Sequence, residues 1–198
     1  VTVPVRASGT GIEGTVSDTL NVLIVDAVAD KPTGVAGTAA IAGNHTAAQS
    51  GGEVPLEVKA QFGDYADGSE QHYLVFDLDS GLAGISGFPA GWTLLDTAQQ
   101  RVDAGLLLFS DTSRYVVVQV PNTYLQDQAR LGRVDVPLTA TLDEAASDKD
   151  LTLNFTAVAV DTPSDMDITS NNNYAATPGS ASVTVHTVTS DPVLHIAV

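Results

Sequence analysis

The segment Leu151-Thr152-Leu153-Asn154-Phe155-Thr156-Ala157-Val158-Ala159-Val160 decides the fold class, because it is rich in β-branched and apolar residues and is bounded by turn-forming residues. This composition favours a β-strand. The same features recur in five further segments: Val54–Phe62, His72–Asp77, Tyr115–Val120, Val134–Leu142 and Ala181–Val188. Several short strands separated by turn signals predict an all-β protein, an antiparallel β-sandwich with long loops.

No segment of the sequence shows a convincing helical repeat of apolar residues. The best candidate lies around Asn122–Arg130, after Pro121, where Tyr124, Leu125 and Ala129 would share one face of a helix. An ordinary loop is the alternative for this segment. We therefore expect at most one short helix.

The start and the end of the chain share a pattern. Leu23–Pro32 and Val183–Pro192 each combine an alternating β-branched run with a short acidic or polar step and a proline. Proline cannot donate to a strand ladder, so such a step favours a boundary between modules. We expect residues 1–32 to hold the last strands of a preceding or split module, residues 33–191 one elaborated sandwich, and residues 192–198 the start of a linker. Coincidence between two Val/Thr-rich strands is the alternative.

The composition excludes several kinds of functional site and of binding partner. The 198 residues include no cysteine, so disulfides, thiolate catalysis and cysteine-based zinc sites are excluded. Asp and Glu number 24 against 8 Lys and Arg, and the net charge of −16 repels nucleic acid and anionic membrane surfaces. No apolar run is long enough for insertion into a membrane. Such an excess of carboxylates favours binding of Ca²⁺, with a merely solubilising surface charge as the alternative.

The densest acidic turn is Asp64-Tyr65-Ala66-Asp67-Gly68-Ser69-Glu70. Oxygen ligands at short spacing around a glycine are typical of a calcium loop, so Asp64, Asp67 and Glu70 are predicted to bind Ca²⁺. We expect Gly68 to adopt a backbone conformation that suits glycine. The turn lacks the full EF-hand pattern and its flanking helices, and a solvated turn is the alternative.

A second polar segment separates two strong strands, where a plain hairpin would need only a few residues. It contains three carboxylates, three amides and an aromatic ring: Asp161, Asp165, Asp167, Asn171, Asn172, Asn173 and Tyr174. Long ordered loops are often functional, so we expect the carboxylates to hold Ca²⁺ and the asparagines and tyrosine to bind a ligand. A solvated loop is the alternative. Asp26 and Asp30 flank the predicted module boundary, where Ca²⁺ would stiffen the joint.

Enzyme signatures are weak or missing. The four histidines fall at no zinc-ligand spacing, and the chain has neither a P-loop nor a dinucleotide-binding glycine motif. The sequence of so acidic a chain leaves open whether two carboxylates act in glycoside hydrolysis, because only their separation in space decides that role. We expect a protein without catalytic residues.

Two longer stretches resemble a known family. Phe62-Gly63-Asp64-Tyr65-Ala66-Asp67-Gly68-Ser69-Glu70, followed by a strand and Ile85-Ser86-Gly87-Phe88-Pro89-Ala90-Gly91-Trp92-Thr93-Leu94, resembles the signature of immunoglobulin-like or cadherin-like modules in giant RTX adhesins, exported by type I secretion. Val25-Asp26-Ala27-Val28-Ala29-Asp30-Lys31-Pro32-Thr33 is similar to the segment that links such modules. The resemblance implies a calcium-dependent immunoglobulin-like β-sandwich, extracellular on the bacterial surface. Its neighbours would be further modules of the same adhesin.

The second half departs from the plain module pattern, since Asp103–Asp150 is long and varied. One ligand-binding domain of these adhesins resembles this chain in size and acidity and captures the C-terminal carboxylate of peptides through Ca²⁺. The resemblance thus implies a peptide-binding adhesion module used in biofilm formation, with peptide or protein C-termini on other cells as partners, or glycans as the alternative. A structural calcium-stiffened extender and a carbohydrate-binding module are the alternative functions.

Overall fold

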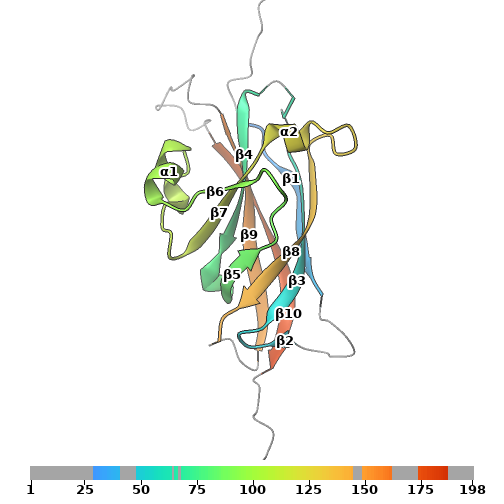
Figure 1. Cartoon of the computed structure of the whole chain (residues 1–198), viewed down its shortest axis with the longest axis vertical. Coiled ribbons are helices and arrows are strands. Elements are labelled where there is room, and N and C mark those ends of the chain that lie inside the picture. The colour runs from blue at the N-terminus through green and yellow to red at the C-terminus, as the bar shows by residue number, and fades with distance from the viewer. Residues whose placement is uncertain are drawn as a thin grey trace, which may run out of the picture.

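The computed structural model describes residues 29–40, 48–63, 65–66, 68–144, 149–161 and 174–186. They form two β-sheets packed face to face (Figure 1). The first sheet has four antiparallel strands. In spatial order these are β1 (Thr33–Ala39), β3 (Glu53–Gln61), β8 (Arg133–Leu142) and β5 (Leu82–Ser86).

The second sheet has six strands. In spatial order they are β2 (Ala48–Gln49), β10 (Tyr174–His186), β9 (Lys149–Asp161), β4 (Glu70–Asp77), β7 (Tyr115–Val120) and β6 (Thr93–Leu94). All neighbours in this sheet are antiparallel except β2 and β10, which pair in parallel over two residues. The predicted antiparallel immunoglobulin-like β-sandwich is confirmed.

One hydrophobic core fills the space between the sheets. Strands β3 and β8 alternate between exposed and buried residues, so one face of their sheet is apolar. This face meets inward residues of the six-stranded sheet such as Leu74, Phe76 and Phe155, none more than 2% exposed. Full burial of side chains of this size stabilises the fold by roughly 1.5–3 kcal/mol each.

A second, smaller cluster covers part of the outer face of the six-stranded sheet. Between β6 and β7 the chain forms α1 (Ala98–Asp103) and the 3₁₀-helix η2 (Leu107–Phe109), and Leu106 packs with the outward residues of the sheet. These outward residues are Tyr73, Val75, Val117, Val158 and Val160. We call residues 95–114 the β6–β7 insertion. It adds a third layer over one region of the sandwich.

Arg101 holds the β6–β7 insertion together. Its side chain is buried, and its guanidinium donates four hydrogen bonds to backbone carbonyls. Nε reaches the oxygen of Leu95 at 2.8 Å, Nη1 reaches those of Phe109 and Asp111 at 3.0 Å each, and Nη2 reaches that of Tyr115 at 2.9 Å. Burial lowers the pKa of the guanidinium from its usual value, and nearby carboxylates oppose that shift. The fork geometry of Arg suits such convergent acceptors.

The described chain enters and leaves the sandwich at opposite ends of its long axis. The backbone N–H of Asp30 donates to Glu70 Oε1, which places the approach to β1 beside the start of β4. Strand β10 ends at His186, opposite the start of β9, whereas Asp161 ends β9 beside Glu70. The 13 residues of β9 span about 40 Å, so the two ends of the described sandwich lie about that far apart (Figure 1).

The structure agrees closely with five of the six predicted strands, namely β3, β4, β7, β8 and β9. The sixth, β10, begins at Tyr174, well before the predicted Ala181, and β1, β2, β5, β6 and the helix α1 are not predicted. The expectation of at most one short helix is therefore wrong, because α1 forms in addition to α2. The predicted helix at 122–130 is α2 (Asn122–Leu125) only. Ala129 is exposed outside it, because Asp127 Oδ1 accepts from the N–H of Ala129 and offers the backbone a turn instead. The predicted module boundaries stay predictions.

Candidate functional site

Three predicted metal ligands, distant in the sequence, share one end of the sandwich, which we call the acidic pole: Asp30, Glu70 and Asp161. Glu70 and Asp161 are directly opposed in the β4–β9 register, so their side chains lie on the same face of the sheet. Both point inward, at 1% and 8% exposure. The N–H of Asp30, which is exposed, donates to Glu70 Oε1. Glu70 therefore lies next to both residues, as acceptor of the backbone N–H of Asp30 and as cross-strand neighbour of Asp161.

The acidic turn lies against this pole. A Cβ built at Gly63 would collide with the carboxylate of Asp30, so Gly63, next to the predicted ligand Asp64, packs directly on Asp30. Gln126 Nε2 holds the turn by donating to the carbonyls of Tyr65 and Ala66 at 3.2 and 3.1 Å. Gly68 has φ +83°, which confirms the expected glycine conformation. Asp64 and Asp67 themselves lie outside the described residues.

A histidine faces the buried carboxylate. Asn122 Nδ2 donates to the carbonyl of Glu70 at 3.1 Å, so its Oδ1 must be the atom that accepts from His72 Nδ1, at 2.9 Å. The second ring nitrogen, Nε2, then lies 3.3 Å from Glu70 Oε2, and neither atom has a hydrogen-bond partner. Glu70 and His72 therefore form a close, buried acid–base pair at the centre of the acidic pole.

The structure brings together only part of the predicted metal set. No three Asp, Glu or His side chains within the described ranges are grouped closely enough to hold an ion. Six predicted residues fall outside those ranges, in addition to the two aspartates of the acidic turn: Asp26, Asp165, Asp167 and Asn171–Asn173. The predicted Ca²⁺ site therefore stays a prediction, with Glu70 as its described centre.

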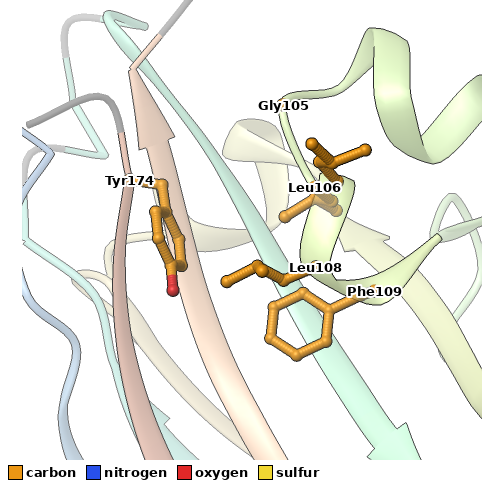
Figure 2. Close-up of a pocket in the computed structure, with 6 residues that line it drawn as sticks. Gly105, Leu106, Leu108, Phe109 and Tyr174 are labelled. Atoms are coloured by element: carbon orange, nitrogen blue, oxygen red, sulfur yellow. The ribbon is translucent and has the colours of Figure 1, made fainter. Parts of the chain in front are cut away.

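Tyr174, the predicted ligand-binding aromatic residue, lines a pocket. It is the first residue of β10 and lies on the outer face of the sheet, opposite Val160 of β9. Figure 2 shows its ring facing Leu106 and Leu108 of the β6–β7 insertion, with β9 between them. Gly105, Leu107 and Phe109 complete the lining of this pocket of about 170 Å³. We call it the apolar pocket.

Three of the residues that line the apolar pocket, Leu107, Leu108 and Tyr174, are exposed apolar side chains. Six large apolar residues are notably exposed among those the structure describes: Leu94, Val102, Leu107, Leu108, Leu131 and Tyr174. All but Leu131 belong to β6, the β6–β7 insertion or the start of β10. Leu107 and Leu108 are each 68% exposed. Apolar residues grouped on a surface in this way mark an interaction site more often than scattered ones do.

Neither helix of the β6–β7 insertion is predicted from the sequence, although the long and varied segment Asp103–Asp150 overlaps the insertion. Two signals were available in the chain, the capping-box pair Thr97 and Gln100 and the apolar run Leu106–Phe109 after Gly105. The acidic residues that it does select are spread between the acidic pole and the undescribed parts of the chain. The aromatic rings of Phe88, Trp92 and Tyr124 pack on one another and against the core, so they do not form an exposed sugar-binding platform.

Comparisons with known proteins add a fold-level likeness. No family model and no curated protein matches the chain. The C-terminal fragment of a major pilin of Streptococcus agalactiae aligns at 12% identity and TM-score 0.45, over 79% of this chain and 56% of the pilin fragment. The major pilin subunit of Bacillus cereus aligns at 12% identity and TM-score 0.43, over 79% of this chain and 40% of that one.

A cohesin module from a Clostridium perfringens glycoside hydrolase aligns at 10% identity and TM-score 0.39, over 77% of this chain and 97% of the module. The chain thus spans about half the length of the two pilin structures it matches. No helix in the described ranges is long and apolar enough to cross a membrane. At these identities the fold assignment rests on the strand order and packing of the chain itself, an immunoglobulin-like β-sandwich.

Proposed function

We propose that the chain is a calcium-dependent, ligand-binding module of a bacterial surface adhesin. The observation that carries this proposal is the acidic pole, where a buried glutamate with an unpartnered oxygen accepts from the backbone of Asp30 and lies opposite Asp161 on the neighbouring strand. The sequence resemblance of the acidic turn to adhesin modules supports the same assignment. The polypeptide C-terminus is the proposed ligand.

The acidic pole supplies carboxylates of the kind that bind Ca²⁺, and further ligands would come from the adjoining turn. Carboxylate oxygens are the ligands this hard cation prefers, and burial without a counter-charge is costly for a carboxylate. Asp30, Glu70 and Asp161 would hold the ion together with Asp64 and Asp67 of the adjoining turn. The bound ion would neutralise Glu70 and fix the approach of the chain to β1.

The ligand site is proposed beside the acidic pole, between Asp161 and Tyr174. A cation held there by Asp161, Asp165 and Asp167, with a coordination position left open, would attract a carboxylate that the net charge of −16 otherwise repels. Asn171, Asn172 and Asn173 would donate to the bound peptide. The exposed ring of Tyr174, already part of the apolar pocket, would contact its last side chain.

The metal assignment is tested by thermal unfolding in Ca²⁺ and in a chelator. A ligand that binds only the folded state at a thousandfold excess over Kd adds about 4 kcal/mol, roughly 8–16 °C in Tm for a chain of this size. Glu70→Gln should abolish most of this rise. The matched control is Glu53→Gln, an exposed glutamate at the far end of β3, which should retain it. Equal melting temperatures in Ca²⁺ and chelator would refute the assignment.

The ligand assignment is tested with short peptides that have free or amidated C-termini. Binding should require both Ca²⁺ and the free carboxylate, and the double variant Asp165→Ala plus Asp167→Ala should lose it. Calcium-independent binding, or equal binding of amidated peptides, would exclude carboxylate capture.

The placement of the chain ends favours one second candidate, a structural extender. Because the described chain enters and leaves at opposite ends, the sandwich suits a linear array of modules. Stabilisation by Ca²⁺ without binding of any peptide would favour this function.

A further inference from the structure

The apolar pocket has the size of a single side chain. Its volume of about 170 Å³ lies below the roughly 300 Å³ at which pockets for whole small-molecule ligands begin. An apolar protein cavity of about 150 Å³ holds a benzene ring. The pocket is therefore large enough for one leucine or phenylalanine side chain of a partner and too small for a complete drug-sized ligand.

The lining is apolar and already partly assembled. Leu106 is buried and packs with Val160 and Tyr73 of the sheet below, so one wall of the pocket belongs to the outer cluster. Leu108 and Tyr174 form facing walls from two distant parts of the chain (Figure 2). Insertion of an apolar side chain would remove apolar surface on both walls from water.

Acidic residues flank the lining stretch of the pocket in the sequence. Asp103 and Asp111 lie two residues before and two residues after the lining stretch Gly105–Phe109, and both are exposed. The insertion up to Asp111 contains one basic residue, Arg101, whose guanidinium is buried and occupied by carbonyls. Strand β10, from Tyr174 onward, carries no Asp, Glu, Lys or Arg. A partner that inserts a side chain here meets carboxylates, and the one exposed cation of the insertion, Arg114, is already paired with Asp77 and Asp79.

From this combination we propose that the apolar pocket binds one leucine or phenylalanine side chain of a polypeptide partner whose neighbouring residues are lysine or arginine. A second copy of this chain and an anionic lipid surface both carry the wrong charge for this face. The inference rests on the proposed function in one respect, since Tyr174 belongs to the ligand site in both. It differs in requiring neither a free C-terminus nor direct contact with Ca²⁺.

The test uses a fluorescein-labelled, C-terminally amidated short peptide with a central phenylalanine between pairs of lysines. Fluorescence anisotropy is measured on the full chain at low ionic strength with saturating Ca²⁺. Two comparison peptides replace the phenylalanine by alanine or the lysines by glutamates. We expect each comparison peptide to bind at least about tenfold more weakly than the first, because one loses the inserted side chain and the other the charge attraction. Added salt should weaken binding of the first peptide.

Two matched variants locate the binding. Leu108→Ser should weaken binding about tenfold, and its 68% exposure means that the fold does not depend on it. Leu131→Ser changes an equally apolar side chain, 52% exposed and outside the pocket, and should bind as the parent chain does.

Equal binding of the phenylalanine and alanine peptides, unchanged binding by Leu108→Ser, or no binding of the lysine-phenylalanine peptide would overturn the inference. A failure of the proposed calcium and carboxylate mechanism would be detected in separate experiments. The peptides used here are amidated, and calcium-induced stabilisation is measured without them.

Discussion

At the scale of single residues, the acidic pole depends on the absence of a side chain at Gly63. Its φ lies outside the left-handed region, so its backbone would accept alanine, but the added methyl would meet the carboxylate of Asp30. The Asp30 side chain would then have to move away from residue 63. A defect in Gly63→Ala would thus report on the position of the aspartate rather than on backbone strain.

We predict that Gly63→Ala loses much of the calcium-induced rise in Tm while losing only about 1 kcal/mol of stability in chelator. Gly84→Ala is the matched control, because a Cβ there meets no atom within 4 Å. Thermal unfolding with and without Ca²⁺ measures both quantities. A full calcium response in Gly63→Ala would show that Asp30 does not take part in the site.

Tyr73 gives a prediction for alkaline pH. Burial beneath the β6–β7 insertion raises its pKa to about 12 from a usual value of 10. Because the unfolded chain ionises this tyrosine first, the stabilisation is complete below pH 10 and is lost as the pH rises from 10 towards 12. The two-unit difference corresponds to roughly 2–3 kcal/mol.

Tyr73→Phe should lose about 1 kcal/mol at pH 8, because the hydroxyl donates to Gln71 Oε1. The parent chain should then lose more stability than Tyr73→Phe between pH 10 and 12, so the gap between them closes or reverses. Urea unfolding across this range measures the difference. A gap that stays constant with pH would show that Tyr73 ionises equally in both states.

At the scale of elements, the β6–β7 insertion is a short segment held by one cation. Its helix α1 has six residues, too few for stability from helix propensity alone. The capping box fixes its start, and the four hydrogen bonds of Arg101 join α1 to the residues before and after it. The position of the pocket wall formed by the insertion therefore depends on the hydrogen bonds of this one guanidinium.

We predict that Arg101→Met destabilises the chain by at least about 2–3 kcal/mol, since it leaves several carbonyls without their charged donor. Arg101→Lys should not restore the parent value, because an ammonium cannot reach four acceptors in a fork. Arg133→Met, at an exposed position of β8, is the control and should be nearly neutral. Urea unfolding gives the stability, and hydrogen exchange at residues 98–115 shows whether the loss is local. Parent-like stability of Arg101→Met would contradict this role.

At the scale of the whole molecule, the sequence predicts the strands whose residues repeat on one face. Strands β3 and β8 show a complete alternation, and β7 matches its predicted bounds. The first half of β10 escapes prediction because Pro178 and Gly179 are typical of a turn. At Pro178, β10 has β9 as its only neighbour, because its pairing with β2 is confined to Val185 and His186, and the open side accepts a proline. A Cβ at Gly179 would collide with Val35 and Phe155.

The candidate sites show a similar limit. The sequence identifies Glu70 and Asp161 as acidic residues but not as cross-strand neighbours, because the register of β4 and β9 joins residues far apart in the chain. The apolar pocket is missed for the same reason. Its two walls, Leu108 and Tyr174, meet only after β10 has paired with β9 and the insertion has folded over the sheet.

The opposite placement of the chain ends also determines how the sandwich would respond to mechanical force. A pull applied between the acidic pole and the end of β10 acts along the strands, and β10 is paired with β9 from Tyr174 to Val185. Sliding these strands past each other must break many of their hydrogen bonds at once, whereas peeling would break them one at a time. The resistance of the tethered module is then set by its unfolding rate under load rather than by its equilibrium stability.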